Sequence, residues 1–244
     1  MSDGPLLILA ATRMELADLA VGLEGEAPAN LPAWPDAQRG RLDGHGVILL
    51  ASGVGKASAA AGVAYAHARV GLTACINVGI AGAYVGAFVP VGAAVAAASE
   101  FDLDAGIIAD SAEGTTMTSL DTVPLPRVAP FEGSPGLFDT FPTDSTWTDH
   151  LAAASGTTAQ PFATSDAIAG DLDVAAERAD RSGAAIESME GAGAALACAH
   201  LGVPFAALRG VSNVAGVRDK AQWDVSTAVR AYTNALRSAL RGAA

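Results

Sequence analysis

Two short stretches of the chain place a carboxylate and an amide where apolar elements begin or end. Residues 186–193 (IESMEGAG) put Glu190 at the start of an Ala-rich helix, and residues 209–213 (RGVSN) end an apolar strand with Asn213. A carboxylate can accept hydrogen bonds from two sugar hydroxyls, and an amide can read the edge of a base. The pair therefore favours a nucleoside ligand. Taken singly, Glu190 could be an acid at a helix N-terminus and Asn213 the cap of a turn.

A further carboxylate, Glu15, follows the first apolar run of the chain. Residues 6–11 read as a buried strand and residues 13–23 as a helix, with Thr12 at the position of its N-cap. A Glu in the first turn of a helix is most often a solvated residue stabilised by the helix dipole. Beside a ligand, the same carboxylate can act as a general base.

Two glycine-rich segments lie between the apolar runs. Residues 52–56 (SGVGK) resemble a phosphate-binding turn, but a P-loop needs Gly at position 50 and Ser or Thr at position 57, which are Leu50 and Ala57. We therefore predict a tight strand-to-helix turn. Residues 77–82 (NVGIAG) are predicted to end a strand with two glycines, which let the backbone approach a ligand closely.

Together these segments resemble the nucleoside phosphorylase and nucleosidase superfamily. The segments are residues 11–15 (ATRME), 52–56, 77–82, 188–190 and 209–213, and in this order they look like methylthioadenosine nucleosidases and futalosine hydrolases over nearly the whole chain. The resemblance implies an α/β fold of three layers, α/β/α, with a central mixed and partly barrel-like sheet. It also implies a single domain over residues 1–244 and at least a homodimer.

The resemblance also assigns roles to residues. Glu15 would polarise the attacking water, Met189 and Glu190 would hold the ribose, and Asn213 would act on the base. The sugar site would further be lined by the turn over residues 79–82, which includes Ile80, Ala81 and Gly82. Hydrolysis of an N-glycosidic bond passes through an oxocarbenium-like state, so a carboxylate on the ribose hydroxyls can bind more strongly as positive charge grows on the sugar. No cofactor and no metal are expected.

Two positions depart from the methylthioadenosine nucleosidases. Those enzymes carry Asp where this chain has Asn213, and Phe over the base where it has Ile168. An Asn offers N–H donors to N7 or O6 of a 6-oxopurine, whereas O6 would repel a carboxylate. The two departures put an adenine-specific pocket in doubt, and the Asn resembles the futalosine hydrolases, whose substrate is a hypoxanthine nucleoside with a 5′ extension that ends in a benzoate. Arg218 and Trp223 could meet this benzoate, or could be a surface cation and a core aromatic.

The expected reaction is hydrolysis of futalosine to hypoxanthine and dehypoxanthine futalosine, a step of menaquinone biosynthesis. One alternative is a methylthioadenosine or adenosylhomocysteine nucleosidase with relaxed recognition of the base. Another is a purine nucleoside phosphorylase, which dependence on phosphate would distinguish. A non-catalytic nucleoside-binding module is disfavoured because Glu15 and Glu190 are both present.

Composition excludes several other classes. A net charge of −12 and a pI near 4.6 argue against nucleic acid as a partner, because a polyanion needs a basic surface. Cys75 and Cys198 lie in apolar segments without paired spacing, which indicates reduced thiols and a cytoplasmic protein, and the four histidines lack the spacing of a zinc site. Residues 70–99 carry no charge and are long enough to span a bilayer, but their glycines and Pro90 favour two buried strands around a turn.

The remaining periodicity predicts alternating strands and helices. Strands are expected at residues 73–79, 93–99, 160–165, 184–187 and 204–212, with a hairpin over residues 39–51 that turns at Asp43-Gly44. Helices are expected at residues 56–69, 171–180, 190–200 and 224–241. Residues 28–35 and 115–142 are predicted as loops, the second of them a candidate lid or interface.

Overall fold

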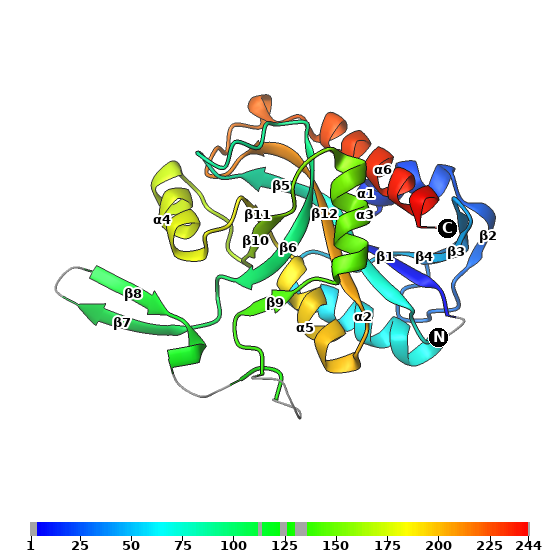
Figure 1. Cartoon of the computed structure of the whole chain (residues 1–244), viewed down its shortest axis with the longest axis horizontal. Helices are drawn as coiled ribbons and strands as arrows, with labels where there is room; N and C mark the ends of the chain where they lie inside the picture. Colours follow the sequence, from blue (N-terminus) through cyan, green and yellow to red (C-terminus); the bar gives the residue numbers. More distant parts are fainter. Residues whose placement is uncertain (1–3, 112–113, 123–125, 130–135, 244) are drawn as a thin grey trace.

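The chain folds around a mixed ten-stranded sheet with the order β11-β10-β6-β12-β5-β1-β4-β3-β2, and β9 also pairs with β6 (Figure 1). The structure, a computed structural model, describes residues 4–111, 114–122, 126–129 and 136–243. The strands of this sheet are β1 (Leu6–Ala10), β2 (Glu24–Pro28), β3 (Gln38–Leu42), β4 (His45–Ala51), β5 (Ala74–Ala83), β6 (Ala94–Asp102), β9 (Thr140–Pro142), β10 (Gln160–Thr164), β11 (Ile186–Ser188) and β12 (Phe205–Val214). A separate two-stranded sheet is formed by β7 (Ile107–Ser111) and β8 (Gly114–Thr118).

Four strands at the centre of the sheet are parallel and buried on both faces. β1 pairs in parallel with β4 and β5, and β5 pairs in parallel with β12. All five residues of β1 are buried, as are the first nine of the ten residues of β12. Such strands read as continuous apolar runs rather than as alternating patterns. This explains why their apolar runs, rather than any periodicity, locate them in the sequence.

The sheet closes on itself at one end. β11 pairs in parallel with β10 and in antiparallel fashion with β5, so that β5, β12, β6, β10 and β11 form a ring. The expected mixed and partly barrel-like sheet is thereby confirmed. The carboxyl ends of β5 and β12 and the short β11 meet in this ring, through the pairs Glu187 with Gly82 and Asn213 with Gly82.

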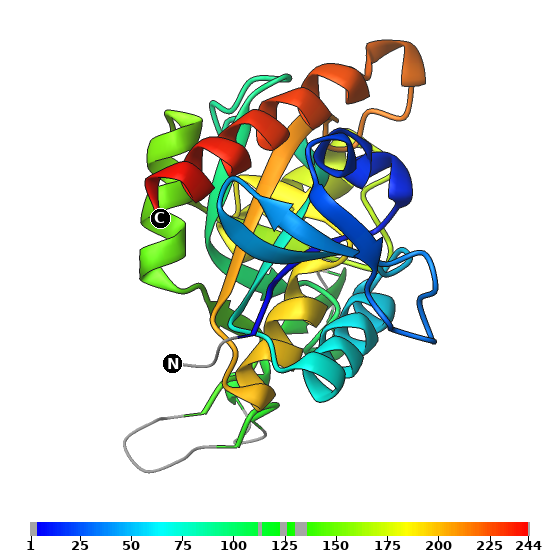
Figure 2. The ribbon, with the colours of Figure 1, turned by 90° about the vertical axis from the view of Figure 1, so that its right-hand side faces the viewer.

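Helices cover both faces of the sheet, as expected for three layers. The helices are α1 (Arg13–Val21), α2 (Lys56–Val70), α3 (Ser145–Ser155), α4 (Leu172–Ser182), α5 (Gly191–Leu201) and α6 (Val225–Gly242), with 3₁₀ turns η1 (Leu120–Thr122) and η2 (Lys220–Gln222). α2 and α5 bury their small residues in one apolar cluster, while α1, α3 and α6 contribute to the cluster on the opposite face. Figure 2 shows α2 and α5 on one side of the sheet and α6 on the other.

Several elements differ from those predicted. The strand expected to end at Gly79 runs on to Ala83, so the predicted turn over residues 79–82 is wrong: β5 is paired on both edges there, by β12 and β11, and the ladder keeps the glycines extended. β2, α3 and the β7–β8 hairpin were not predicted. β8, η1 and β9 also lie in or beside the segment 115–142 that was expected to be a loop, of which residues 123–125 and 130–135 lie outside the described residues.

The two buried strands expected within residues 70–99 are confirmed as β5 and β6. No helix among the described residues has the length and hydropathy needed to cross a membrane.

Candidate active site

A cavity of about 230 Å³ lies where β5, β11 and β12 end. Its wall comes from the start of α1, the turn before α2, the loop after β10, the β11–α5 junction and the segment after β12. The structure brings all nine residues named from the sequence into this wall: Glu15, Ile80, Ala81, Gly82, Ile168, Met189, Glu190, Asn213 and Arg218.

Glu15 is held in place by the start of its own helix. Thr12 and Glu15 form a capping box, in which the Thr12 N–H and hydroxyl donate to Glu15 Oε2 at 2.9 and 2.8 Å. The N–H of Ile80 donates to Oε1 at 3.1 Å. A Cβ on Gly79 would lie 2.7 Å from Oε1, so β5 can approach the carboxylate this closely only with glycine there. The result is a buried, oriented carboxylate whose remaining lone pairs can bind a water.

Glu190 is the N-cap residue of α5, but its side chain does not cap that helix. Its Oε1 instead accepts a hydrogen bond from the N–H of Gly55 at 3.0 Å. Burial raises the pKa of Glu190 above its ordinary value, and the nearby Glu15 carboxylate raises it further, while Arg209 and the Gly55 N–H oppose both effects. Glu190 therefore faces the cavity with one oxygen engaged by the 52–56 turn and the other able to accept from a ligand.

Asn213 reaches the cavity because β12 is irregular at its end. The register of β12 against β5 shifts between Val211 and Asn213, and such a bulge re-aims the following side chain. Asn213 Oδ1 accepts from Ser212 Oγ and Nδ2 donates to the carbonyl of Val214, both at 2.8 Å. An amide nitrogen carries two N–H groups, so one donor remains for a ligand.

Sequence reasoning did not single out Arg209 as a functional residue, although it lies beside the site. It is 1% exposed, and it donates to the carbonyl and the side-chain oxygen of Asn77 on β5, while its Nε has no hydrogen-bond partner. Its cation opposes the rise of the Glu190 pKa. A buried charge inside an apolar strand is costly unless a partner compensates it. The presence of Arg209 within the predicted strand 204–212 was therefore the signal that could have identified it as a functional residue.

Glu187 is a second functional candidate that the sequence did not single out. Its Oε1 accepts from the N–H of Ala169 at 2.8 Å, and its Oε2 accepts from Arg178 at 2.7 Å and from the Tyr84 hydroxyl at 3.1 Å. Burial and the Glu187 carboxylate together raise the pKa of Tyr84, which keeps the hydroxyl as a donor. Glu187 lines the cavity and anchors the loop that carries Ile168.

Another buried carboxyl, Glu100 on β6, lies behind the start of α5. Its Oε2 accepts from Thr164 Oγ1 at 2.9 Å, and its Oε1 has no hydrogen-bond partner. Burial raises the pKa of Glu100 to about 7, against the opposing effects of Arg209 and Thr164 and with a further rise from Glu190. The carboxyl packs against Gly191, where a Cβ would lie 2.0 Å from Oε1.

The open end of the cavity carries a cation and an aromatic ring. The Arg218 guanidinium lies 5.1 Å from the centre of the Trp223 ring, and both residues line the cavity. The indole N–H of Trp223 donates to the carbonyl of Val217 at 3.0 Å, which fixes the ring. This pair can receive a group that combines a negative charge with a flat apolar surface.

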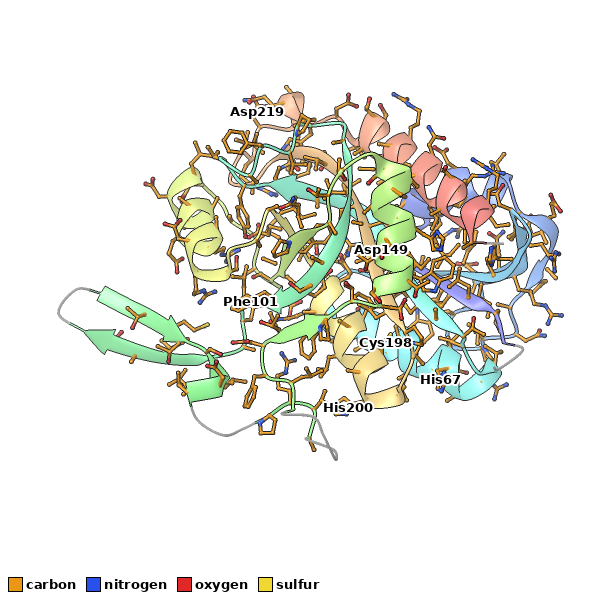
Figure 3. All side chains as sticks on the ribbon, viewed as in Figure 1. His67, Phe101, Asp149, Cys198, His200 and Asp219 are labelled. Atoms are coloured by element: carbon orange, nitrogen blue, oxygen red, sulfur yellow. The ribbon has the colours of Figure 1, made fainter. Side chains whose placement is uncertain are left out.

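The histidines offer little to this site. Figure 3 shows His67 on α2 and His200 on α5 at the opposite end of the molecule from Asp219, which directly follows Arg218. Among the described residues, no three His, Cys, Asp or Glu side chains come together in a way that could hold a metal ion. The lining of the cavity offers carboxylates, an amide, a guanidinium and backbone N–H groups.

Comparison with known proteins agrees with this geometry. The profile of the phosphorylase superfamily matches residues 5–242. The chain is 38% identical to a futalosine hydrolase of Thermus thermophilus over 96% of this chain and 94% of that protein, and 32% identical to a futalosine hydrolase of Streptomyces coelicolor over 94% and 93%.

A solved methylthioadenosine/adenosylhomocysteine nucleosidase of S. pneumoniae, bound to a transition-state inhibitor, superposes with a TM-score of 0.80. The match covers 98% of this chain and 99% of that one at 22% identity, which supports the fold alone. The chain belongs to the phosphorylase superfamily and, within it, to the futalosine hydrolase family.

Proposed function

We propose that this protein hydrolyses the N-glycosidic bond of futalosine and releases hypoxanthine and dehypoxanthine futalosine. The observation that carries the proposal is the convergence of Glu15, Glu190 and Asn213 on one cavity, in a chain that is 38% identical to a futalosine hydrolase. We further propose that the reaction serves menaquinone biosynthesis and that the protein acts in the cytoplasm as at least a homodimer.

In the proposed reaction, a water held by Glu15 attacks the anomeric carbon of the ribose. The new C–O bond forms from the water oxygen as the C–N bond to the purine breaks, and Glu15 takes a proton from the water. General-base help of this kind is worth about 10²- to 10⁴-fold in rate. Because both carboxylate oxygens are already hydrogen-bonded to backbone N–H groups, the base needs little reorganisation before it acts.

The sugar and the leaving base would be stabilised from opposite sides. Glu190 and Met189 line the cavity, and we assign them to the ribose, because a carboxylate on the ribose hydroxyls binds more tightly as positive charge develops on the sugar. The electron pair of the broken bond goes to the purine, and the unengaged N–H of Asn213 can stabilise this charge through N7 or O6. The purine then takes a proton from solvent and leaves as hypoxanthine, while Glu15 returns its proton to solvent. Ile168 would cover the base.

The charges around the cavity favour water over phosphate as the nucleophile. Glu15, Glu187 and Glu190 line the cavity, and Glu15 already accepts from the N–H groups of Thr12 and Ile80 that could otherwise bind an anion. Among the described residues, Arg218 is the one cation in the lining, and it lies with Trp223 at the open end. There it suits the carboxylate of the benzoate extension.

A direct test is to incubate the protein with futalosine, inosine and methylthioadenosine, each with and without phosphate, and to measure the released base by liquid chromatography. We expect hypoxanthine from futalosine at a rate independent of phosphate. Release of adenine from methylthioadenosine in preference would indicate the adenine-specific nucleosidase instead. Formation of a ribose 1-phosphate product would instead indicate a phosphorylase.

A further inference from the structure

Lys56 ends the 52–56 turn but does not line the cavity. Its Nζ donates to Asp102 Oδ1 and to Asp104 Oδ2, both at 2.6 Å, and lies 3.8 Å from Asp166 Oδ2. Its backbone N–H donates to Asp166 Oδ1 at 3.0 Å. The side chain that suggested a phosphate-binding lysine in the sequence is thus fully engaged by carboxylates.

These carboxylates connect two walls of the cavity. The first wall is the 52–56 turn, in which Val54 lines the cavity and the Gly55 N–H donates to Glu190. The second wall is the loop over residues 165–170, which carries Ile168. In this loop Ser165 Oγ and the Asp166 N–H donate to the two carboxylate oxygens of Asp104, at 2.9 and 2.7 Å.

The lysine and one of its carboxylates are shielded from water, whereas Asp104 and Asp166 are 37% and 57% exposed. The side chain of Lys56 is 15% exposed and that of Asp102 is 3% exposed. Burial lowers the pKa of Lys56, but Asp102 and Asp104 outweigh this effect and keep the pKa above its ordinary value, so the ammonium stays charged throughout the range in which enzymes are assayed. Hydrogen-bonded charges in such surroundings rigidify the segments that carry them.

We propose that Lys56 is a positioning residue that joins the two walls of the nucleoside cavity and thereby sets where Glu190 and Ile168 sit. The proposal relies on the proposed function only for the reaction used as a kinetic readout. Loosening the 52–56 turn would withdraw the Gly55 N–H from Glu190, and loosening the 165–170 loop would displace Ile168 from the base.

The test replaces Lys56 with methionine, which keeps the apolar stem and removes the ammonium. The matched control is Arg127→Met, because Arg127 also donates to Asp102, at 2.6 Å, but neither lines the cavity nor bonds to either wall. A displacement of about 1 Å can cost about a hundredfold in rate. We therefore expect Lys56→Met to lose about ten- to a hundredfold in kcat/KM, mostly in kcat, and Arg127→Met to stay within about threefold.

The pH profile separates positioning from mere stabilisation. The charged or titratable groups that face Glu190 are Arg209 from β12, Glu15 from α1 and Glu100 from β6, and the Gly55 N–H adds a donor that lowers the Glu190 pKa. If Lys56→Met removes that donor, the acidic limb of kcat/KM should move upward by about half a unit to one unit. Lys56→Arg should restore part of the activity and should return the acidic limb of kcat/KM part of the way to its wild-type pH. A lower Tm with an unchanged limb and unchanged kcat would overturn the proposal.

Hydrogen exchange provides a readout that does not depend on the reaction. Lys56→Met should speed amide exchange in residues 53–56 and 165–170, whereas Arg127→Met should leave exchange in both segments unchanged. If the wild-type protein cleaves no nucleoside, the proposed function fails while this comparison still decides the inference.

Should Lys56→Met not fold, Asp104→Ala severs the link to the second wall at a side chain that is 37% exposed. That variant should still speed exchange in residues 165–170. Equal exchange in all variants would contradict the inference.

Discussion

The isosteric substitution Glu100→Gln should change how the stability of the protein depends on pH. Glu100 is fully buried, and its pKa rises from an ordinary 4.5 to about 7 in the folded state. Below the unfolded pKa both states bind the proton, so folding carries no ionisation penalty. As pH rises from about 4.5 through 7 the unfolded state loses its proton first, and the wild-type protein loses stability.

The magnitude follows from the size of the shift. A rise from 4.5 to about 7, at about 1.36 kcal/mol per pKa unit, corresponds to about 3 kcal/mol of stability lost above pH 7. A glutamine at this position has no proton to lose and pays no such penalty. Because the unfolded carboxyl is already mostly ionised at pH 5, about 2.5 kcal/mol of this loss falls between pH 5 and pH 8. At about 2–4 °C per kcal/mol for a chain of this size, the Tm of Glu100→Gln relative to wild type should rise by about 5–10 °C over that range.

Scanning calorimetry across this pH range, at one fixed protein concentration, measures the effect. The control is Glu26→Gln, which makes the same substitution at an exposed position on strand β2 and so reports the effect of the residue change without burial. Parallel Tm curves for Glu100→Gln and wild type would refute the reasoning, because they would mean that Glu100 is ionised at pH 5 in the folded protein as well.

Three further predictions concern catalysis. Asn213→Asp should lower kcat/KM for futalosine relative to its 6-amino analogue, because a carboxylate facing O6 leaves a buried acceptor unpaired. The cost of about 1–3 kcal/mol corresponds to a change of about five- to a hundred-and-fifty-fold in the ratio of the two kcat/KM values. An equal loss on both substrates would make Asn213 a structural residue. Glu15→Gln and Glu190→Gln should each lose at least about a hundredfold in kcat while remaining folded by circular dichroism, and wild-type kinetics in either would remove that residue from the mechanism. Treatment with EDTA and omission of phosphate should leave the rate on futalosine unchanged, which a coupled assay for hypoxanthine can follow.

Local signals were sufficient to predict much of the first half of the fold. The Thr12 N-cap, the turn at Asp43-Gly44 and the helix that starts at Lys56 all occur where they were predicted, because each depends on residues close in sequence. The convergence of the nine site residues on one cavity was expected from the family resemblance rather than from periodicity. Residue spacing alone gives no distance between β5 and β12.

The missed features depend on contacts between distant segments. β5 continues past Gly79 because β11 and β12 pair with it from both sides, and no pattern within residues 79–83 indicates this. The buried partners of the site, Glu100 and Glu187, resemble ordinary strand-end acids until the packing is known. α3 is different, since Asp144 caps its start and Gly156 ends it in the left-handed conformation, so its signals were present in the sequence and overlooked.

The capping box of α1 has a consequence for how this active site can change over evolutionary time. The carboxylate proposed as the general base is also the side chain that closes the first turn of α1 onto Thr12. Loss of a helix cap typically costs about 1 kcal/mol, so a mutation that removes the base also weakens the start of the helix. A lineage that exchanged water for an anionic nucleophile would have to replace Glu15 and rebuild this helix start together. Because two coordinated substitutions are required, single mutations do not readily convert this hydrolase into an enzyme that uses another nucleophile.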